Sequence, residues 1–195
     1  MKTESKLQGC QLWLVRHGQT DWNIQGRYQG QSDIPLNAVG QAQAADLAAQ
    51  LAGQTFTAIY SSDLQRASCT AQAVGDAVNL PVRLDDRLRE IDQGEWEGMD
   101  YRDIVRQYAG LMEQRAQAAE SFRAPGGESI PEVVQRVASA ADEIACAHPG
   151  GRVLVVSHGV ALAALICRAG GISINEIYSH IPHNAQPVVV QWPGD

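Results

Sequence analysis

The chain has 195 residues, of which 45% are hydrophobic and 19% are charged, and its formal net charge is −7. Such a length and composition are typical of one globular domain with a sizeable core. The negative charge and the lack of a basic stripe argue against nucleic acid as a partner, and no apolar stretch is long enough to span a bilayer. Lysine occurs only at Lys2 and Lys6, so any later anion site has to use arginine, histidine or backbone amides.

The first predicted element is a strand over residues 10–15. Residues 1–8 before it are polar, and we expect them to be disordered. The run is apolar and lacks helical periodicity, which indicates a strand buried on both faces, as in a parallel sheet. It ends abruptly in Arg16 and His17. Ligands of open α/β sheets bind beyond the carboxyl ends of the strands, so we expect these two side chains to face a cleft, where an arginine offers donors that fit a phosphate.

A helix is predicted after the polar, Gly-rich loop at 25–35. Asn37 can serve as its N-cap. The spacing of small and apolar residues indicates an amphipathic helix that packs on the sheet. The expected core-facing stripe is Gly40, Ala44, Leu47, Ala48 and Leu51.

A short strand at 57–60 leads into another predicted helix, which Ser62 or Asp63 could cap. Arg66 falls in the first turn of this helix. An arginine in that place is usually a solvated surface charge. Here, however, the turn faces the carboxyl edge of the sheet, where backbone amides and the positive helix end favour anions. Arg66 is therefore a candidate anion ligand.

The remaining elements continue the alternation of helices and strands. We expect an extended segment at 81–84, a turn at 93–98, one long helix at 101–122, a break at 124–129, a helix at 130–147, a strand at 152–156, a helix at 160–166 and a last strand at 187–192. Because the chain has no internal repeat and no linker, we predict a single domain over 9–195. Its fold class is α/β, a three-layer α/β/α sandwich around a mostly parallel central sheet.

Two of the predicted strands end in the same way. The strand at 10–15 is followed by His17 and Gly18, and the strand at 152–156 is followed by His158 and Gly159. If the strands are neighbours, both imidazoles lie at one edge of the sheet. A single histidine at a strand end is more often structural, but two of them, one preceded by an arginine, favour a catalytic site.

The four cysteines predict the compartment. Cys10, Cys69, Cys146 and Cys167 are scattered, without CxxC spacing and without a preceding secretory signal. We therefore expect four buried thiols in a reducing cytoplasm.

Several sequence blocks together resemble the signature of the histidine phosphatase superfamily, the phosphoglycerate-mutase-like proteins. They occur in the family's order and cover nearly the whole chain, and they imply a phosphoglycerate mutase-like fold. The blocks are 14–20 with Trp22 and Asn23, 61–67, 88–98 and 156–159, and the Pro-Gly-Gly-Glu-Ser stretch at 125–129 is also family-like.

The resemblance implies a role for each polar residue of these blocks. His17 would be the nucleophile that takes the phosphoryl group, which requires an unprotonated ring nitrogen facing phosphorus and an acceptor, such as a backbone carbonyl, for the proton on the other nitrogen. Arg16, Arg66 and His158 would bind the phosphoryl oxygens. Glu90 would protonate the leaving oxygen and then act as base for the attacking water. The residues that match substrate- or phosphate-binding positions are Asn23, Gln29, Gly30 and Gly159.

Within the family, the phosphatase branch is the better match. The mutases are longer, carry extra basic residues for a second phosphate, and have a tyrosine where this chain has Gln93. We predict a phosphomonoester hydrolase that acts on a small phosphorylated metabolite through a phosphohistidine, with neither metal nor cofactor. A phosphomutase and a non-catalytic phospho-ligand-binding protein are the alternatives.

Four further expectations concern Glu90, a metal, the segment at 99–129 and the assembly. Glu90 could instead be a surface carboxylate paired with Arg87 or Arg89. A metal hydrolase could use the two strand-end histidines, Asp63 and Glu90, although HxH and HExxH spacings are missing and the two arginines would repel a cation. Residues 99–129 are the least patterned part of the chain, apart from the family-like stretch at 125–129, and mix arginines with aromatic residues, so we expect a lid that sets specificity. The oligomeric state is open, with a homodimer as one possible assembly.

Overall fold

One mixed sheet forms the centre of the computed structural model, which describes residues 9–193. The predicted disordered segment at 1–8 lies outside the described residues. The strand order is β3-β2-β4-β1-β5, and the neighbouring strands are parallel except for β5, which runs antiparallel to β1. The strands are β1 (Cys10–Arg16), β2 (Ala58–Ser61), β3 (Val82–Leu84), β4 (Arg152–Ser157) and β5 (Pro187–Trp192).

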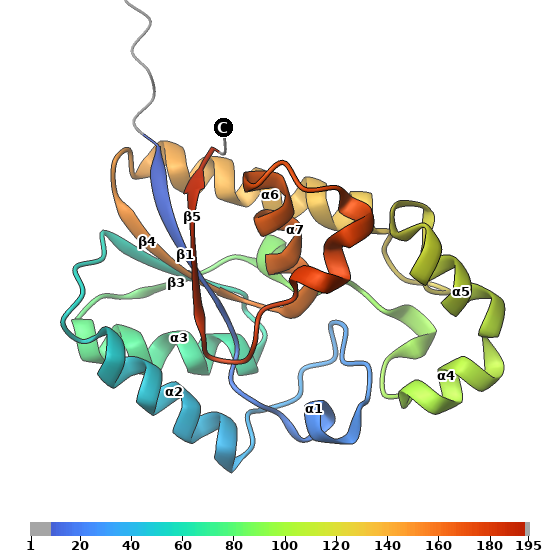
Figure 1. The fold of residues 1–195 in the computed structure, drawn as a ribbon. Coiled ribbons are helices and arrows are strands. Elements are labelled where there is room, and N and C mark those ends of the chain that lie inside the picture. The colour runs from blue at the N-terminus through green and yellow to red at the C-terminus, as the bar shows by residue number, and fades with distance from the viewer. Residues whose placement is uncertain (1–8, 194–195) are drawn as a thin grey trace, which may run out of the picture.

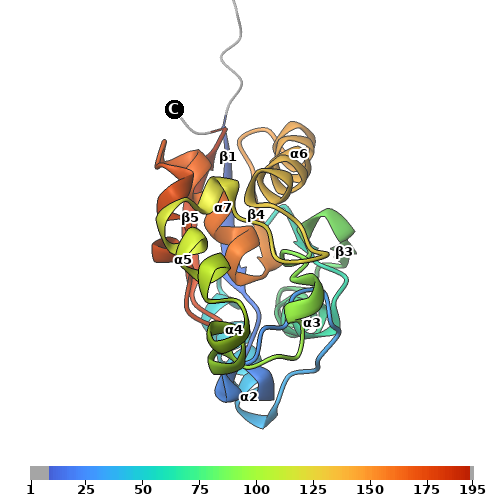
Figure 2. The same cartoon turned by 90° about the vertical axis from the view of Figure 1, so that its right-hand side faces the viewer.

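Helices cover both faces of this sheet, as the three-layer prediction requires (Figures 1 and 2). On one face α6 and α7 pack on Leu12, Leu14 and Val155, and on the other face α2 and α3 pack on Val15 and Leu154. The alternation of β1 between the two clusters confirms that this strand is buried on both sides. The helices are α1 (Asp21–Gln25), α2 (Ala38–Leu51), α3 (Gln65–Val78), α4 (Tyr101–Gln107), α5 (Ala109–Gln117), α6 (Ile130–Ala147) and α7 (Gly159–Ala169), with short 3-10 helices at Asp86–Leu88, Gly94–Trp96, Ala119–Ser121 and Ile174–His180.

Most of the predicted elements are confirmed. Helix α2 is capped by Asn37, whose side chain accepts a hydrogen bond from Gly40 N, and its buried residues are those of the predicted stripe. Helix α6 and strand β5 have the predicted bounds. The predicted cap of α3 is wrong, because this helix begins after Leu64 without a side-chain cap. Asp63 pairs with Arg89 instead.

The predicted long helix at 101–122 is also wrong. The chain leaves the helical conformation at Tyr108, which has φ −128° and ψ 36°, and α4 and α5 meet there. The reason is a tertiary contact, since the rings of Tyr108 and Phe122 both pack on buried Trp96, at centroid distances of 5.7 and 5.3 Å. One straight helix could not bring both Tyr108 and Phe122 to the same side chain. Helices α4 and α5 thus form a small cluster of their own beside the sheet (Figure 1).

The prediction of four buried thiols holds for two of them. Cys10 and Cys167 are buried, whereas Cys69 and Cys146 are exposed because they lie on the outward sides of α3 and α6. All four are free thiols. Within residues 9–193, no helix combines the length and the apolar character needed to cross a membrane.

Candidate active site

The two strand-end histidines lie side by side. Strands β1 and β4 are parallel neighbours in a register that pairs Arg16 with Ser157, so the next residue of each strand, His17 and His158, emerges at the same edge. The centroids of the two rings are 5.1 Å apart. The expectation that both imidazoles share one sheet edge is therefore met.

His17 is a neutral imidazole, and one of its ring nitrogens is hydrogen-bonded to the backbone. Its Nδ1 lies 2.7 Å from the carbonyl oxygen of Gly18, which makes Nδ1 the protonated nitrogen and leaves the lone pair on Nε2. Burial, together with the positive charges of Arg66 and Arg16, lowers the pKa of His17 well below its ordinary value. The backbone around the ring is fixed as well, because Asn184 Nδ2 donates to the His17 carbonyl over 2.7 Å.

The two arginines are anchored by loop carbonyls. Arg66 is fully buried and donates through Nη1 to Ser32 O (2.7 Å) and through Nη2 to Gly30 O (2.8 Å). Arg16 donates through Nη1 to Pro182 O over 3.2 Å. The Nε atom of each arginine is buried and has no hydrogen-bond partner among the described residues. Since leaving a buried donor unpaired is costly, these N–H groups are suited to an anionic ligand.

His158 offers a third buried donor of this kind. Its Nε2 lies 2.9 Å from Ser62 Oγ, while its Nδ1 has no partner in the described part of the chain. Ser62 Oγ already accepts a bond from Leu64 N, so its hydroxyl hydrogen is available for Nε2. In the tautomer that accepts this hydrogen at Nε2, the ring proton of His158 is on Nδ1. Burial and the charge of Arg66 lower the pKa of His158 well below its usual range, so the ring is neutral. Sequence reasoning missed the part played by Ser62.

Glu90 closes the site at the N-terminus of α7. Its Oε1 accepts hydrogen bonds from Ile91 N (3.0 Å), Val160 N (3.1 Å) and Ala161 N (3.2 Å). The carboxyl group thus satisfies backbone donors that a capping side chain would otherwise take. Oε2 has only one long contact, 3.3 Å from Val160 N, and a Cβ added at Gly159 would lie 3.4 Å from it.

The surface reading of Glu90 is wrong. Both arginines that could have paired with it are engaged by other carboxylates. Arg89 pairs with Asp63, and Arg87 pairs with Asp85 and Glu143.

A pocket of about 180 Å³ joins most of these groups. Seven of the predicted site residues line it, whereas His158 and Gly159 are not among the lining residues. A larger hollow of about 570 Å³ lies at the opposite end of the sheet, around Gly9 and Arg152, but no histidine or carboxylate of residues 9–193 lines it. The smaller pocket is lined by Arg16, His17, Asn23, Gly26, Arg27, Tyr28, Gln29, Gly30, Arg66, Glu90 and Gln93.

Some of the residues predicted to bind the substrate or phosphate also have structural roles. Asn23 Oδ1 accepts a bond from Thr20 N in the capping box of α1, so its amide NH₂ is the part left for a ligand. The Thr20 hydroxyl also lies 3.1 Å from Gln29 Oε1. Gly30 has a positive φ of 52°, and a side chain there would overlap Glu97. Gly30 therefore serves to present its carbonyl oxygen to Arg66.

Four of the lining residues were not predicted as site residues, namely Gly26, Arg27, Tyr28 and Gln93. Gln93 is 7% exposed, and its Oε1 has no partner within residues 9–193. The sequence signal that could have identified Gln93 as a site residue was its place three residues after Glu90. Over the same residues, no group of three His, Cys, Asp or Glu side chains is arranged to hold a metal ion.

Comparison with known proteins identifies the class of protein that carries this site. The family model "Histidine phosphatase superfamily (branch 1)" matches residues 12–195, and the chain belongs to this superfamily. The chain is similar to the probable phosphoglycerate mutase GpmB of Salmonella choleraesuis, with 38% identity over 162 residues, which are 83% of this chain and 75% of the relative.

Two solved structures show the same fold. A mycobacterial glucosyl-3-phosphoglycerate phosphatase in complex with VO3 shares 32% identity at a TM-score of 0.85 and covers 92% of this chain and 90% of its own. A putative alpha-ribazole-5'-P phosphatase from Escherichia coli shares 31% identity at a TM-score of 0.84, with coverage of 93% and 90%. The predicted family and the phosphoglycerate mutase-like fold are confirmed.

Proposed function

We propose that the protein is a phosphomonoester hydrolase that works through a phosphohistidine at His17. One observation carries the proposal. The Nδ1–H of this buried ring is bound to Gly18 O, so the lone pair is on Nε2. Around the same strand ends lie buried nitrogen atoms of Arg16, Arg66 and His158 that have no hydrogen-bond partner in the described part of the chain. A nucleophile and three donors for the equatorial phosphoryl oxygens are what phosphoryl transfer needs.

In the first step Nε2 of His17 attacks phosphorus, and the bond from phosphorus to the leaving oxygen breaks. The N–H groups of Arg16, Arg66 and His158 donate hydrogen bonds to the three equatorial oxygens and stabilise their charge. Glu90 gives a proton to the leaving oxygen, which departs as an alcohol. Oε2 is the suitable proton carrier, because Oε1 is already held by three backbone N–H groups.

In the second step a water molecule takes the place of the alcohol. The Glu90 carboxylate accepts one proton from this water as its oxygen attacks the phosphohistidine. The bond from phosphorus to Nε2 breaks, and inorganic phosphate leaves with the neutral histidine and the protonated Glu90 restored.

A phosphomutase is the second candidate, because the chain resembles relatives called probable phosphoglycerate mutase. A mutase has to hold a doubly phosphorylated intermediate, which calls for cationic groups beyond the first phosphate site. Besides Arg16 and Arg66, the lining residues include one cation, Arg27. Its guanidinium already donates to Gly98 O and Gln25 Oε1, so the geometry favours hydrolysis.

Small phosphorylated metabolites are the proposed substrates. The pocket, at about 180 Å³, is below the range of roughly 300–1,000 Å³ of sites for drug-sized ligands, and the similar structures include phosphatases of glucosyl-3-phosphoglycerate and α-ribazole phosphate. We place the protein in the cytoplasm because its four cysteines are free thiols.

A panel of phosphomonoesters that includes 3-phosphoglycerate tests the proposal. We expect inorganic phosphate and the free alcohol in equal amounts from the substrates that react. Conversion of 3-phosphoglycerate into its 2-phospho isomer without release of phosphate would instead identify a mutase.

A further inference from the structure

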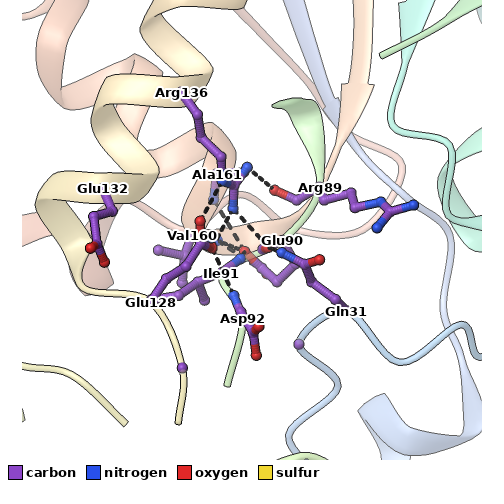
Figure 3. Close-up of polar contacts among 12 residues, drawn as sticks. Gln31, Arg89, Glu90, Ile91, Asp92, Glu128, Glu132, Arg136, Val160 and Ala161 are labelled. Atoms are coloured by element: carbon purple, nitrogen blue, oxygen red, sulfur yellow. Dashed lines mark hydrogen bonds and ion pairs between the residues drawn. The ribbon is translucent and has the colours of Figure 1, made fainter. Parts of the chain in front are cut away.

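The backbone of the loop that carries Glu90 accepts hydrogen bonds from one arginine side chain of α6. Arg136 donates through Nη1 to Arg87 O over 2.8 Å. It also donates through Nη1 to Arg89 O (2.6 Å) and through Nη2 to Glu90 O (2.8 Å), as Figure 3 shows. Its side chain is only 18% exposed. A planar guanidinium is the one side chain that can serve several carbonyl oxygens in a fixed geometry.

Glu128 completes this support and neutralises the buried charge. Arg136 Nε and Nη2 donate to its two carboxylate oxygens, each over 2.8 Å. Glu128 also forms two hydrogen bonds with Asp92, two residues after Glu90. Glu128 Oε2 accepts from Asp92 N, and Glu128 N donates to Asp92 O, both over 2.9 Å. Burial opposes ionisation of Glu128, but the bonds from Arg136 and Asp92 N keep its pKa below the ordinary value.

The Pro-Gly-Gly-Glu-Ser stretch at 125–129 brings Glu128 into place. Pro125 O accepts a hydrogen bond from Glu95 N over 2.9 Å. A side chain at Gly127 would overlap the carbonyl oxygen of Asp92, and one at Gly94 would overlap Pro125 O. The two loops therefore pack backbone against backbone, which accounts for a family-like motif that contributes no residue to the pocket lining.

The position of Glu90 depends on this support for a simple reason. The residue lies between two short 3-10 helices and belongs to neither. Its carboxyl group has to meet three backbone N–H groups, two of them at the start of α7, and still keep Oε2 near Arg16 and the pocket. A shift of the loop by about 1 Å would break that alignment, and misplacements of this size are costly in catalysis.

We infer that Arg136 and Glu128 are positioning residues that set the place of the acid Glu90 without touching the substrate. The inference rests on the proposed function of Glu90. It predicts that losing either residue impairs proton donation to the leaving group and leaves attack by His17 largely intact. A merely structural role would lower stability, or slow every substrate alike.

Glu128→Gln and Arg136→Gln test the inference, with Glu132→Gln as the matched control. Glu132 is also near the start of α6 and also pairs with an arginine, Arg123. Within the described part of the chain it has no hydrogen bond or ion pair to the Glu90 loop, and it points away from this loop in Figure 3. A glutamine at 132 retains the capping box with Ser129. Glu128→Gln is nearly isosteric, so it serves if Arg136→Gln does not fold.

The readout is the first chemical step with two leaving groups. A positioned acid is worth roughly 10²–10⁴-fold, so each test variant should lose about tenfold or more in single-turnover release of an alcohol from an alkyl phosphate. The phenolate burst from p-nitrophenyl phosphate, whose leaving group hardly needs a proton, should change less than about threefold. Glu132→Gln should match the wild type with both substrates.

The same variants in a Glu90→Gln background separate the outcomes. If Glu128 and Arg136 act through Glu90, they should add little to the loss caused by Glu90→Gln. Three outcomes would overturn the positioning role alone. The test variants could lose equally with both leaving groups, they could lose nothing, or they could lose as much in the Glu90→Gln background as they do in the wild type. If Glu90→Gln itself spared the alkyl ester, the role proposed for Glu90 would fall, and the positioning role with it.

Discussion

Arg66 donates a 2.8 Å hydrogen bond to the carbonyl oxygen of Gly30, so one residue of the candidate site holds another in place. Gly30 can do this because its φ is positive, at 52°, and because it has no Cβ to overlap Glu97. The orientation of the buried guanidinium is thus tied to the backbone of a surface loop.

Gly30→Ala should therefore act on catalysis through Arg66. The added methyl group would push against Glu97 and displace the carbonyl oxygen, so we expect kcat/KM to fall by about tenfold or more, since small misplacements of a catalytic group are costly. Gly171→Ala is the control, because Gly171 also has a positive φ, of 61°, but open space around its Cβ position. It should cost about 1–2 kcal/mol of stability and leave activity unchanged. Wild-type kinetics for Gly30→Ala would show that Arg66 does not depend on this carbonyl.

The pH dependence of stability follows from the two buried histidines. Burial lowers the pKa of both His17 and His158 well below their usual range. Below about pH 6.5 the unfolded chain binds protons that the folded protein does not, so the free energy of unfolding falls as the pH falls. The slope is at most about 1.4 kcal/mol per pH unit for each histidine.

Urea unfolding between about pH 6.5 and 5 measures this slope. Ionised carboxylates with lowered pKa values, such as Glu132 at about 2, lose their contribution only at lower pH, below their unfolded value of 4.5. His158→Gln should make the free energy of unfolding depend less steeply on pH between about pH 6.5 and 5. An equally steep dependence in the variant would show that His158 does not stay neutral in the folded state.

The predicted lid at 99–129 contains one arginine that is placed to affect specificity. Arg115 stacks on Tyr178 at 3.8 Å and lies 5.7 Å from the ring of the pocket residue Tyr28. We expect Arg115→Met to change KM between sugar phosphates several-fold while kcat on p-nitrophenyl phosphate stays within about twofold, because the stack contacts none of the reacting groups. Arg106→Met is the control, since Arg106 is exposed and pairs with Asp103. A collapse of kcat on every substrate would place Arg115 in the catalytic machinery.

Metal independence is a separate prediction. The positive charge at the site comes from Arg16 and Arg66, whose guanidinium groups can take the place that a metal has in other phosphatases. We expect full activity after dialysis against EDTA and inhibition by vanadate, an oxyanion that can occupy the phosphoryl site. Activity that disappears in EDTA and returns with one divalent metal would refute the assignment.

The sheet and its edge could be predicted because their signals are local. The apolar runs of β1 and β4 and the polar residues after them are contiguous in the sequence, so the meeting of His17 and His158 could be predicted on the condition that the two strands are neighbours. The parallel pairing of β1 with β4 meets this condition. The break at Tyr108 could not be found in this way. It depends on packing against Trp96, and an uninterrupted helical pattern carries no sign of it.

The supporting contacts of the site were hidden for a similar reason. Arg136 meets the carbonyl oxygen of Glu90 from 46 positions away, and Ser62 meets His158 across 96 positions. Such pairs depend on how α6 and the loops at the sheet edge pack together. The side chains that we propose to carry the chemistry could therefore be named from the family's motifs, whereas the side chains that hold them in place could not.

Rapid quenching of a single turnover tests the central claim most directly. With a substrate labelled in its phosphoryl group, we expect a transient covalent label that is stable in alkali and lost in acid, on the peptide that contains His17. His17→Ala should show neither label nor turnover, while its circular dichroism matches that of the wild type. A label on any other residue, or wild-type turnover by His17→Ala, would contradict the account.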